Sequence, residues 1–222
     1  MPHARKRILC YVTDRRALGD ASGLGGVLRR AAQAGVDWIQ VREQDLDARA
    51  LAELVRLALE AARETSTRIL VNDRLDVALA TGAAGVHLGE KSLPGETIAA
   101  WRRTANRFDF VIGASCHSPE AARIAEHSGA DYVYFGPVFS TPSKAAFGPP
   151  QGIERLQEAC SAVRIPVYAI GGITAENAAA CLAAGAAGIA AIRLFQQSVD
   201  LAATVASLRG GREIQSQAAP NS

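Results

Sequence analysis

Short apolar segments recur along the chain, and longer segments of mixed character separate them. Eight such segments occur, at residues 8–13, 36–42, 68–72, 85–88, 110–115, 131–136, 166–171 and 188–192. Short apolar runs bounded by turn residues are typical of buried strands. The pattern therefore predicts eight β-strands.

The segments between these strands have helical spacing. They are rich in Ala, Leu, Arg and Glu, as in the stretch DARALAELVRLALEAARE from Asp47 and the stretch SPEAARIAEH from Ser118. Ser118 is a suitable helix N-cap, because its hydroxyl can accept a hydrogen bond from a free backbone N–H group. The sequence thus predicts that strands and helices alternate.

A weak internal repeat supports this alternation. A glycine follows the helical stretch, with an apolar run just beyond it, in four segments: QAGVDWIQ, ATGAAGVHL, HSGADYVYF and AAGAAGIAAI. Glycine readily adopts the left-handed conformation that ends many helices. We therefore expect each of these four glycines to stop a helix shortly before a strand.

Eight strand–helix units without a long polar break between them favour one α/β fold. We predict a single (βα)8 TIM barrel over residues 1–209, near the lower size limit of that fold. The alternative is an open, doubly wound sheet. The last segment, GREIQSQAAPNS, is polar and aperiodic, so residues 210–222 are expected to form a flexible tail that carries no chemistry.

Composition excludes several classes of partner. The 222 residues include 24 Lys and Arg against 22 Asp and Glu, a formal charge of +2 with the signs mixed along the chain. Nucleic acid is therefore not an expected partner. No apolar run approaches the roughly 18 residues that cross a bilayer, so we expect a cytoplasmic protein without a membrane partner. The sequence is compatible with a homo-oligomer.

The four cysteines do not indicate a metal centre or a disulfide framework. They are Cys10, Cys116, Cys160 and Cys181, and their wide spacing matches neither a zinc site nor a CxxC pair. We expect reduced thiols that are mostly buried.

Polar residues stand where the predicted strands end, which is where TIM barrels carry their chemistry. Gln40 and Arg42 share one face of the second strand because side chains alternate along a strand. The full set of candidates at strand ends is Gln40, Arg42, Asn72, Asp73, His87, Ser115, His117, Gly171, Gly172 and Arg193.

Several of these residues have a purely structural alternative. Asn72 and Asp73 could cap a helix that begins at Arg74. His87 lies in an apolar run and is as compatible with a hydrogen-bonded core histidine as with a functional one. Arg42 favours ligand binding, because a guanidinium at the inner mouth of a barrel is costly without an anionic partner.

A nucleophile–base pair of Cys116 and His117 is disfavoured, because neighbours in a strand point to opposite faces. We expect Cys116 to be a packing residue.

The segment GPVFSTPSKAAFGPPQG, residues 136–152, is long for a connection between a strand and a helix. Either it is a loop without a binding role, or it closes over an anionic ligand with Thr141, Ser143 and Lys144 at its centre. Loops after strands 7 and 8 of such barrels often bind phosphate through backbone N–H groups, which Gly171 and Gly172 would supply.

Arg42 and Lys144 add more positive charge than one phosphate ester needs, and the carboxylate of Asp73 is a suitable Mg²⁺ ligand beside phosphate groups. The residues alone therefore indicate small phosphorylated substrates with two anionic groups, one of them bridged by Mg²⁺.

The chain resembles the family of thiamine phosphate synthases and the related thiazole tautomerases. The similarity runs from Tyr11 to Ile192 and rests on the motifs YVTD, IQVRE, LVNDRLDVALATGAAGVHLG, GASCHSPEAA, GADYVYFGPVFSTPSK and PVYAIGGIT, which occur in this order. The synthases join hydroxymethylpyrimidine diphosphate to the nitrogen of a thiazole phosphate and expel pyrophosphate with Mg²⁺ bound. The resemblance thus implies a transferase of thiamine biosynthesis.

The resemblance also implies roles for individual residues. Arg42 and Lys144 would do most of the catalysis with the metal, by neutralising the departing pyrophosphate. Asp73 would bind Mg²⁺, and Thr141 and Ser143 would contact the side of the thiazole phosphate, which Gly171 and the turn after it, with Gly172, would hold. Because Arg193 follows the eighth strand, we expect it to converge on the same phosphate. The diphosphate would lie against Gln40, Arg42, Asn72, Ser115 and Lys144.

Two positions depart from the pattern of the synthases. Gln44 stands where a lysine is usual after the second strand, and Ser92 replaces the second metal carboxylate. Glu90 could supply a substitute carboxylate for the metal, and Lys91 a substitute cation.

Two other functions fit these changes. A thiazole tautomerase would use His117 for proton transfer without metal, and a non-catalytic binder of thiamine precursors would need no catalytic group. The retained ND and TPSK motifs favour the synthase.

Overall fold

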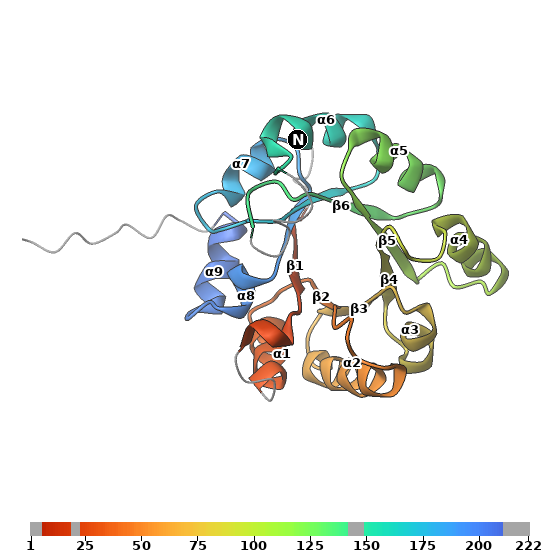
Figure 1. Ribbon diagram of the computed structural model, residues 1–222. Helices are drawn as coiled ribbons and strands as arrows, with labels where there is room; N and C mark the ends of the chain where they lie inside the picture. Colours follow the sequence, from red (N-terminus) through yellow and green to blue (C-terminus); the bar gives the residue numbers. More distant parts are fainter. Residues whose placement is uncertain (1–5, 19–22, 142–148, 211–222) are drawn as a thin grey trace, which may run out of the picture.

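Eight parallel strands close into one barrel in the computed structural model, which describes residues 6–18, 23–141 and 149–210 (Figure 1). The predicted (βα)8 barrel is confirmed, and the alternative of an open sheet is wrong because β1 pairs with β8. The strands are β1 Ile8–Val12, β2 Trp38–Val41, β3 Arg68–Asn72, β4 Gly85–Leu88, β5 Val111–Cys116, β6 Tyr132–Phe135, β7 Val167–Ile170 and β8 Gly188–Ala191.

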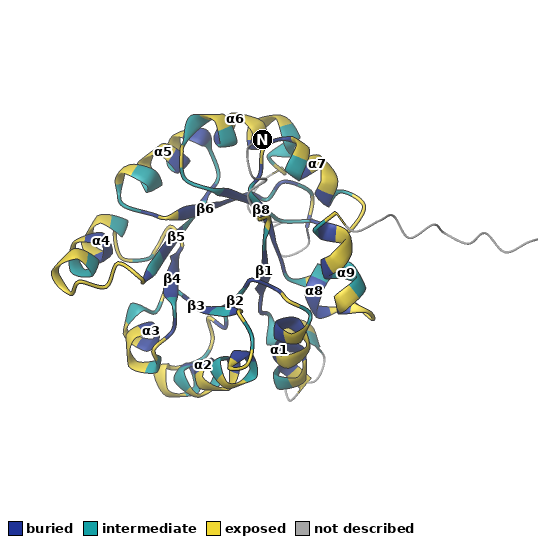
Figure 2. Cartoon of the chain, turned by 180° about the vertical axis from the view of Figure 1, so that it is seen from behind, coloured by how far each residue is buried: buried dark blue, intermediate teal, exposed yellow. Residues whose placement is uncertain are grey.

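Helices surround the barrel and turn their buried faces toward it (Figure 2). They are α1 Leu24–Gln33, α2 Ala48–Ala62, α3 Leu75–Thr81, α4 Gly95–Thr104, α5 Pro119–His127, α6 Gly152–Ala162, α7 Ala178–Ala183, α8 Arg193–Gln196 and α9 Leu201–Leu208. The short helix η1, Arg15–Leu18, follows β1 and has no buried residue. Ser118 caps α5 as predicted, since its side chain accepts a hydrogen bond from Ala121 N. Within the described ranges, no helix is long and apolar enough to span a membrane.

The four glycines of the internal repeat have the predicted left-handed backbone. Gly35, Gly82, Gly129 and Gly185 have φ values of 84°, 74°, 87° and 100°, and each follows a helix directly or after one intervening residue. A side chain with a Cβ atom is strained in this region. The repeat therefore reflects one local device, a glycine that turns the chain from a helix into the next strand.

Apolar side chains form two separate cores. The larger core lies between the strands and the helices, and the smaller one fills the inside of the barrel with Cys10, Leu70, Tyr132, Tyr134 and Tyr168 among its members. All four cysteines are unpaired, and only Cys160 is partly exposed. The predicted reduced, mostly buried thiols are thus confirmed.

One buried carboxylate ties both ends of the described chain to the start of the barrel. Asp37, which is 6% exposed, accepts hydrogen bonds from the backbone N–H of Leu9 at 2.9 Å and from Arg209 Nη2 at 2.9 Å. Lys6 forms an ion pair with its second oxygen. The charge of Asp37 is therefore well compensated, although its side chain is buried.

Gly113 in β5 makes room for the ring of Tyr132 in β6. A Cβ atom at Gly113 would lie 2.1 Å from Tyr132 Cζ, far inside van der Waals contact. We expect Gly113→Ala to lower the free energy of unfolding by about 1–3 kcal/mol, because a tightly packed interior yields little space. Urea unfolding measures this change.

Gly26→Ala in α1 is the matched control. A Cβ atom there would meet only the end of the Arg30 side chain at 3.4 Å, and alanine favours a helix over glycine by about 0.5–1 kcal/mol. This variant should be at least as stable as the original protein. Equal stability of the Gly113→Ala variant and the original would contradict the packing described here.

Candidate functional site

Polar side chains from neighbouring strands meet at the carboxyl end of the barrel. Gln40 Nε2 donates to Asn72 Oδ1 at 2.9 Å, and Asn72 lies beside His87 in the register of β3 and β4. His87 Nε2 lies 2.9 Å from Ser115 Oγ. Gln40, Asn72, His87 and Ser115 therefore form a continuous polar row across four strands, as their positions at strand ends predicted.

Asn72 and Asp73 do not cap the helix that follows them. The N-cap of α3 is Arg74, and no side chain makes a capping hydrogen bond there. Asn72 instead accepts from Gln40, and exposed Asp73 has a left-handed backbone with φ 65°. The capping alternative is therefore wrong, and the backbone strain at Asp73 is of the kind that clusters at functional sites.

Gln40 carries an unsatisfied polar atom inside the site. Its side chain is 1% exposed, and Oε1 is the buried side-chain oxygen or nitrogen that has no hydrogen-bond partner among the described residues. A buried acceptor without a donor costs about 1–3 kcal/mol. This oxygen is suited to accept a hydrogen bond from a ligand.

Arg42 is half-buried at the same end of the barrel, and no carboxylate of the described residues forms an ion pair with it. Its backbone N–H donates to Thr13 Oγ1 at 2.9 Å, which fixes the end of β2 to β1. Neighbouring Glu43 pairs with Arg15 at 3.2 Å. In the part of the chain that the structure describes, Arg42 has no ion pair of its own, so its guanidinium is available to an anion.

A cavity of about 550 Å³ adjoins Arg42. The loops after β1 and β2 line it, and Arg16, Glu43 and Gln44 are among its residues. Gln44, at the position where the synthases carry lysine, is exposed there.

His87 is a neutral core histidine that also reaches the site. Its Nδ1 lies 3.0 Å from the Tyr132 hydroxyl, and its ring stacks on Tyr134 with 4.2 Å between centroids. Burial, with a smaller contribution from the charge of Arg42, lowers the pKa of His87 from 6.5 to about 3. Of the two interpretations of the sequence, the structure supports hydrogen-bonded packing, and it adds the contact with Ser115.

Cys116 and His117 point apart, as predicted. Cys116 belongs to the core under the helices, and burial raises the pKa of its thiol to about 12. His117 Nδ1 contacts the carbonyl oxygen of Gly136, where the long loop begins. These two residues do not form a nucleophile–base pair.

The predicted metal ligands do not form a preassembled cage. Glu90 lies 3.7 Å from His117 Nε2, and Ser92 Oγ accepts a hydrogen bond from Gly89 N at 2.7 Å. No group of three or more His, Cys, Asp or Glu side chains that could hold a metal occurs within the described residues. Exposed Asp73 is the carboxylate that stands directly at the end of β3.

The turn after β7 packs against the beginning of the long loop. Gly171 and Gly172 have φ values of 94° and 67°, and a Cβ atom on Gly172 would lie 2.6 Å from Ser140 O. Phe139 N donates to Gly171 O at 3.0 Å, and Asn177 Nδ2 donates to Gly172 O at 2.9 Å. Only glycine fits this crowded, left-handed turn.

Arg193, from α8, reaches the same region. Its Nη2 donates to Thr141 Oγ1 at 2.9 Å, so the ends of β7 and β8 and residue 141 lie together. Ser143 and Lys144 lie outside the described residues, as does the centre of the long loop at 142–148.

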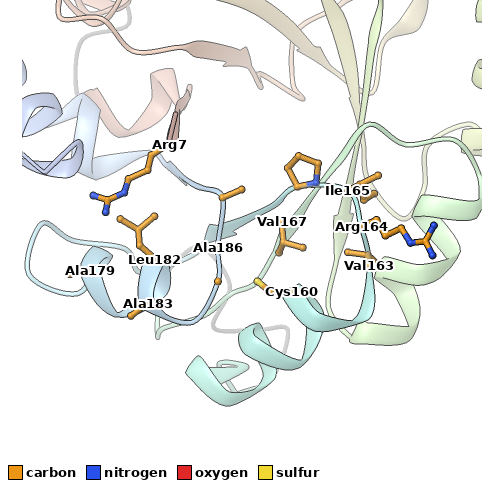
Figure 3. Close-up of a pocket in the computed structure, with 13 residues that line it drawn as sticks. Arg7, Cys160, Val163, Arg164, Ile165, Val167, Ala179, Leu182, Ala183 and Ala186 are labelled. Atoms are coloured by element: carbon orange, nitrogen blue, oxygen red, sulfur yellow. The ribbon is translucent and has the colours of Figure 1, made fainter. Parts of the chain in front are cut away.

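Another cavity, of about 600 Å³, lies where β7 and β8 begin, at the opposite end of these strands (Figure 3). Cys160, Val167 and Leu182 help to line it, and Arg7 and Arg164 point away from each other at its two sides. None of the predicted site residues lines this cavity.

A family model described as thiamine monophosphate synthase matches residues 9–195, which include every strand of the barrel except the first residue of β1. The chain belongs to this family. The match agrees with the resemblance found in the sequence motifs.

Individual relatives cover nearly the whole chain. The thiamine-phosphate synthase of Moorella thermoacetica is 40% identical over 90% of this chain and 93% of its own, and that of Methanoregula boonei is 42% identical over 91% and 92%. Among solved structures, thiamine phosphate pyrophosphorylase from Pyrococcus furiosus is 35% identical, with a TM-score of 0.79 over 93% of this chain and 95% of its own.

Sequence reasoning missed three residues that organise the site: Thr13, Tyr132 and Asn177. Thr13 accepts a hydrogen bond from Arg42, and Tyr132 bonds to His87, although both pairs are far apart in the sequence. Asn177, at the N-cap of α7, donates to Gly172. The period of two gave a usable signal for Tyr132 alone, because Tyr132 and Tyr134 alternate with two apolar residues in β6.

Neutral, buried His87 should make stability depend on pH. Because its pKa is lower in the folded state, the unfolded chain binds one more proton between about pH 6.5 and pH 3, so stability falls as the pH falls through this window. In urea unfolding between pH 4 and 6, His87→Gln should reduce the slope of unfolding free energy against pH by up to about 1.4 kcal/mol per pH unit. Equal slopes in the two proteins would contradict this.

Proposed function

We propose that the protein is a thiamine-phosphate synthase, which couples hydroxymethylpyrimidine diphosphate to a thiazole phosphate and releases pyrophosphate. The observation that carries this proposal is the row of Gln40, Asn72, His87 and Ser115 beside Arg42, which has no ion pair among the described residues, in a chain of this family. A cytoplasmic location and a homo-oligomer stay predictions, which cell fractionation and analytical ultracentrifugation would test.

The diphosphate is proposed to bind against the second to fifth strands. Arg42 supplies a guanidinium suited to phosphate oxygens, and Asn72 and Ser115 supply polar contacts at the depth where Gln40 is buried. The unsatisfied Oε1 of Gln40 accepts from an N–H donor, such as an amino group on the pyrimidine. Lys144 is proposed to add a second cation.

The residues fit Mg²⁺ that arrives with the diphosphate better than Mg²⁺ held by protein alone. Mg²⁺ in phosphoryl sites commonly takes one or two carboxylates and completes its shell with phosphate oxygens and water. Asp73 supplies one exposed carboxylate, and Glu90 would have to leave His117 to supply another. When bound, the metal would neutralise charge on the diphosphate.

The thiazole phosphate is proposed to bind at the ends of β7 and β8. The described residues provide no hydrogen-bond acceptor for Gly172 N–H, and Arg193 and Thr141 lie at the same place. Backbone N–H groups and a guanidinium are suited to a phosphate. Ser143 is proposed to join them from the long loop.

Catalysis then depends mainly on charge and position. As the bond from the pyrimidine methylene carbon to oxygen breaks, negative charge grows on the pyrophosphate, and Arg42 and Lys144 stabilise it. The resulting cation is captured by the thiazole nitrogen, which the phosphate site holds nearby. No base has to remove a proton from the reacting carbon.

Thiazole tautomerase activity is the second candidate. His117 has its Nδ1 fixed by Gly136 O and its Nε2 3.7 Å from Glu90 Oε1, so the imidazole is oriented at the mouth of the barrel. An oriented imidazole is suited to move a proton. This activity would need neither a diphosphate nor a metal.

Two substitutions separate the candidates. For the synthase, Asp73→Asn should lower turnover about a hundredfold to a thousandfold, the usual effect of losing one electrostatic contact in the transition state. His117→Ala should have a much smaller effect. For the tautomerase the order reverses, since proton transfer contributes about a hundredfold to ten-thousandfold.

Both variants are assayed with the two synthase substrates and Mg²⁺, and separately with the thiazole carboxylate phosphate. Asp76→Asn is the matched control, because Asp76 is an exposed carboxylate of α3 that pairs with Arg74. A metal-independent isomerase that tolerates Asp73→Asn but not His117→Ala would overturn the synthase.

Arg193 should affect one substrate only. Arg193→Gln should raise KM for the thiazole phosphate about tenfold, because a hydrogen bond to a charged group contributes about 1.5–3 kcal/mol. KM for the pyrimidine diphosphate should not change. Steady-state kinetics with each substrate varied in turn measures this, with Arg123→Gln on α5 as the control. An equal rise in both KM values would argue against a separate phosphate site.

A further inference from the structure

A buried tyrosine connects to the site through His87. The Tyr132 hydroxyl lies 3.0 Å from His87 Nδ1, and His87 Nε2 lies 2.9 Å from Ser115 Oγ. Tyr132 and His87 are each 1% exposed, whereas Ser115 is partly exposed at the mouth. The three side chains thus form a hydrogen-bonded chain from the interior of the barrel to the proposed diphosphate site.

The direction of these hydrogen bonds depends on one proton. A neutral imidazole carries a single N–H, so one ring nitrogen donates and the other accepts. With the proton on Nε2, His87 donates to Ser115, and the serine hydroxyl hydrogen is free to point into the mouth. With the proton on Nδ1, Ser115 must donate to His87, and its oxygen can then only accept.

The surroundings of His87 favour the proton on Nε2. The Tyr132 hydroxyl is buried and lies 3.0 Å from Nδ1, so its hydrogen is satisfied when Nδ1 carries no proton and accepts it. The Tyr134 hydroxyl, whose ring stacks on His87, donates to Cys10 Sγ at 2.8 Å and does not compete for this nitrogen. The nearby charge of Arg42 disfavours a second proton on the ring.

We propose that Tyr132 is a positioning residue which, through His87, holds the hydroxyl hydrogen of Ser115 toward the mouth of the barrel for donation to an oxygen of the diphosphate. This role rests on the proposed synthase function. It requires the ring of Tyr132 to be fixed, which the close contact of that ring with Gly113 provides.

The tautomer can be measured without any substrate. The chain has four histidines, so ¹⁵N-histidine labelling gives a simple NMR spectrum in which His87→Gln identifies the signals of His87. We expect a protonated Nε2 and a bare Nδ1 in the original protein, and a shift of the proton toward Nδ1 in Tyr132→Phe. A protonated Nδ1 in the original protein, or an unchanged spectrum in Tyr132→Phe, would overturn the proposal.

Kinetics tests the consequence for the reaction. Tyr132→Phe should lower kcat about tenfold, because removal of a residue that orients a contacting group typically costs about this much. KM for the diphosphate should change less, because the charge on the pyrophosphate grows in the transition state. Tyr168→Phe is the matched control, because it removes a hydroxyl from the same aromatic cluster. The control should keep the original kcat.

A double substitution distinguishes this role from general support of the fold. In a Ser115→Ala background, Tyr132→Phe should cause no further loss of kcat, because the serine through which it acts is gone. Additive losses would contradict the proposal. A protein with the expected tautomer but no synthase activity would refute the proposed function alone, and the hydrogen-bonded chain would then serve another anion, for which inorganic pyrophosphate is the calorimetric probe.

Discussion

Closure of the barrel is the constraint on which the site depends. Because β1 pairs with β8, the eight parallel strands form a closed ring, and their carboxyl ends all lie around one mouth. Residues separated by 32 and 28 positions are thereby brought within 2.9 Å, as Gln40 is with Asn72 and His87 with Ser115. The polar row is a direct product of strand register.

The inside of the barrel sets the protonation of this row. Aromatic rings fill the space below it, among them Tyr132, Tyr134 and Tyr168, and they exclude water from His87. A histidine in such surroundings stays neutral. Its proton can therefore serve as a fixed structural element instead of responding to the pH of the solution.

The sequence predicted the architecture because that information is local. Short apolar runs located the strands and helical spacing located the helices, and four glycines marked turns between them. The candidates at strand ends were also accessible, since parallel strands of a barrel all end on one side.

Partners across the fold were not predictable, because they depend on distances that no local pattern contains. Tyr132 meets His87 from 45 positions away. Glu90 pairs with His117, and Ser92 closes its own turn, although the sequence alone offered Glu90 to a metal. The capping alternative for Asn72 failed for the same reason, since its partner Gln40 lies on another strand.

The first strand depends on partners that are synthesised late, and Asp37 is one point where early and late segments meet. Its partners include Leu9 in β1 and Arg209, which follows the last helix, and β1 finds its second neighbour in residues 188–191. During synthesis from the amino terminus, the outer edge of β1 thus stays unpaired until residues 188–191 have been made. An unpaired edge strand can join other chains. The nascent protein is therefore open to misassembly through β1 until residues 188–191 are available to pair with it.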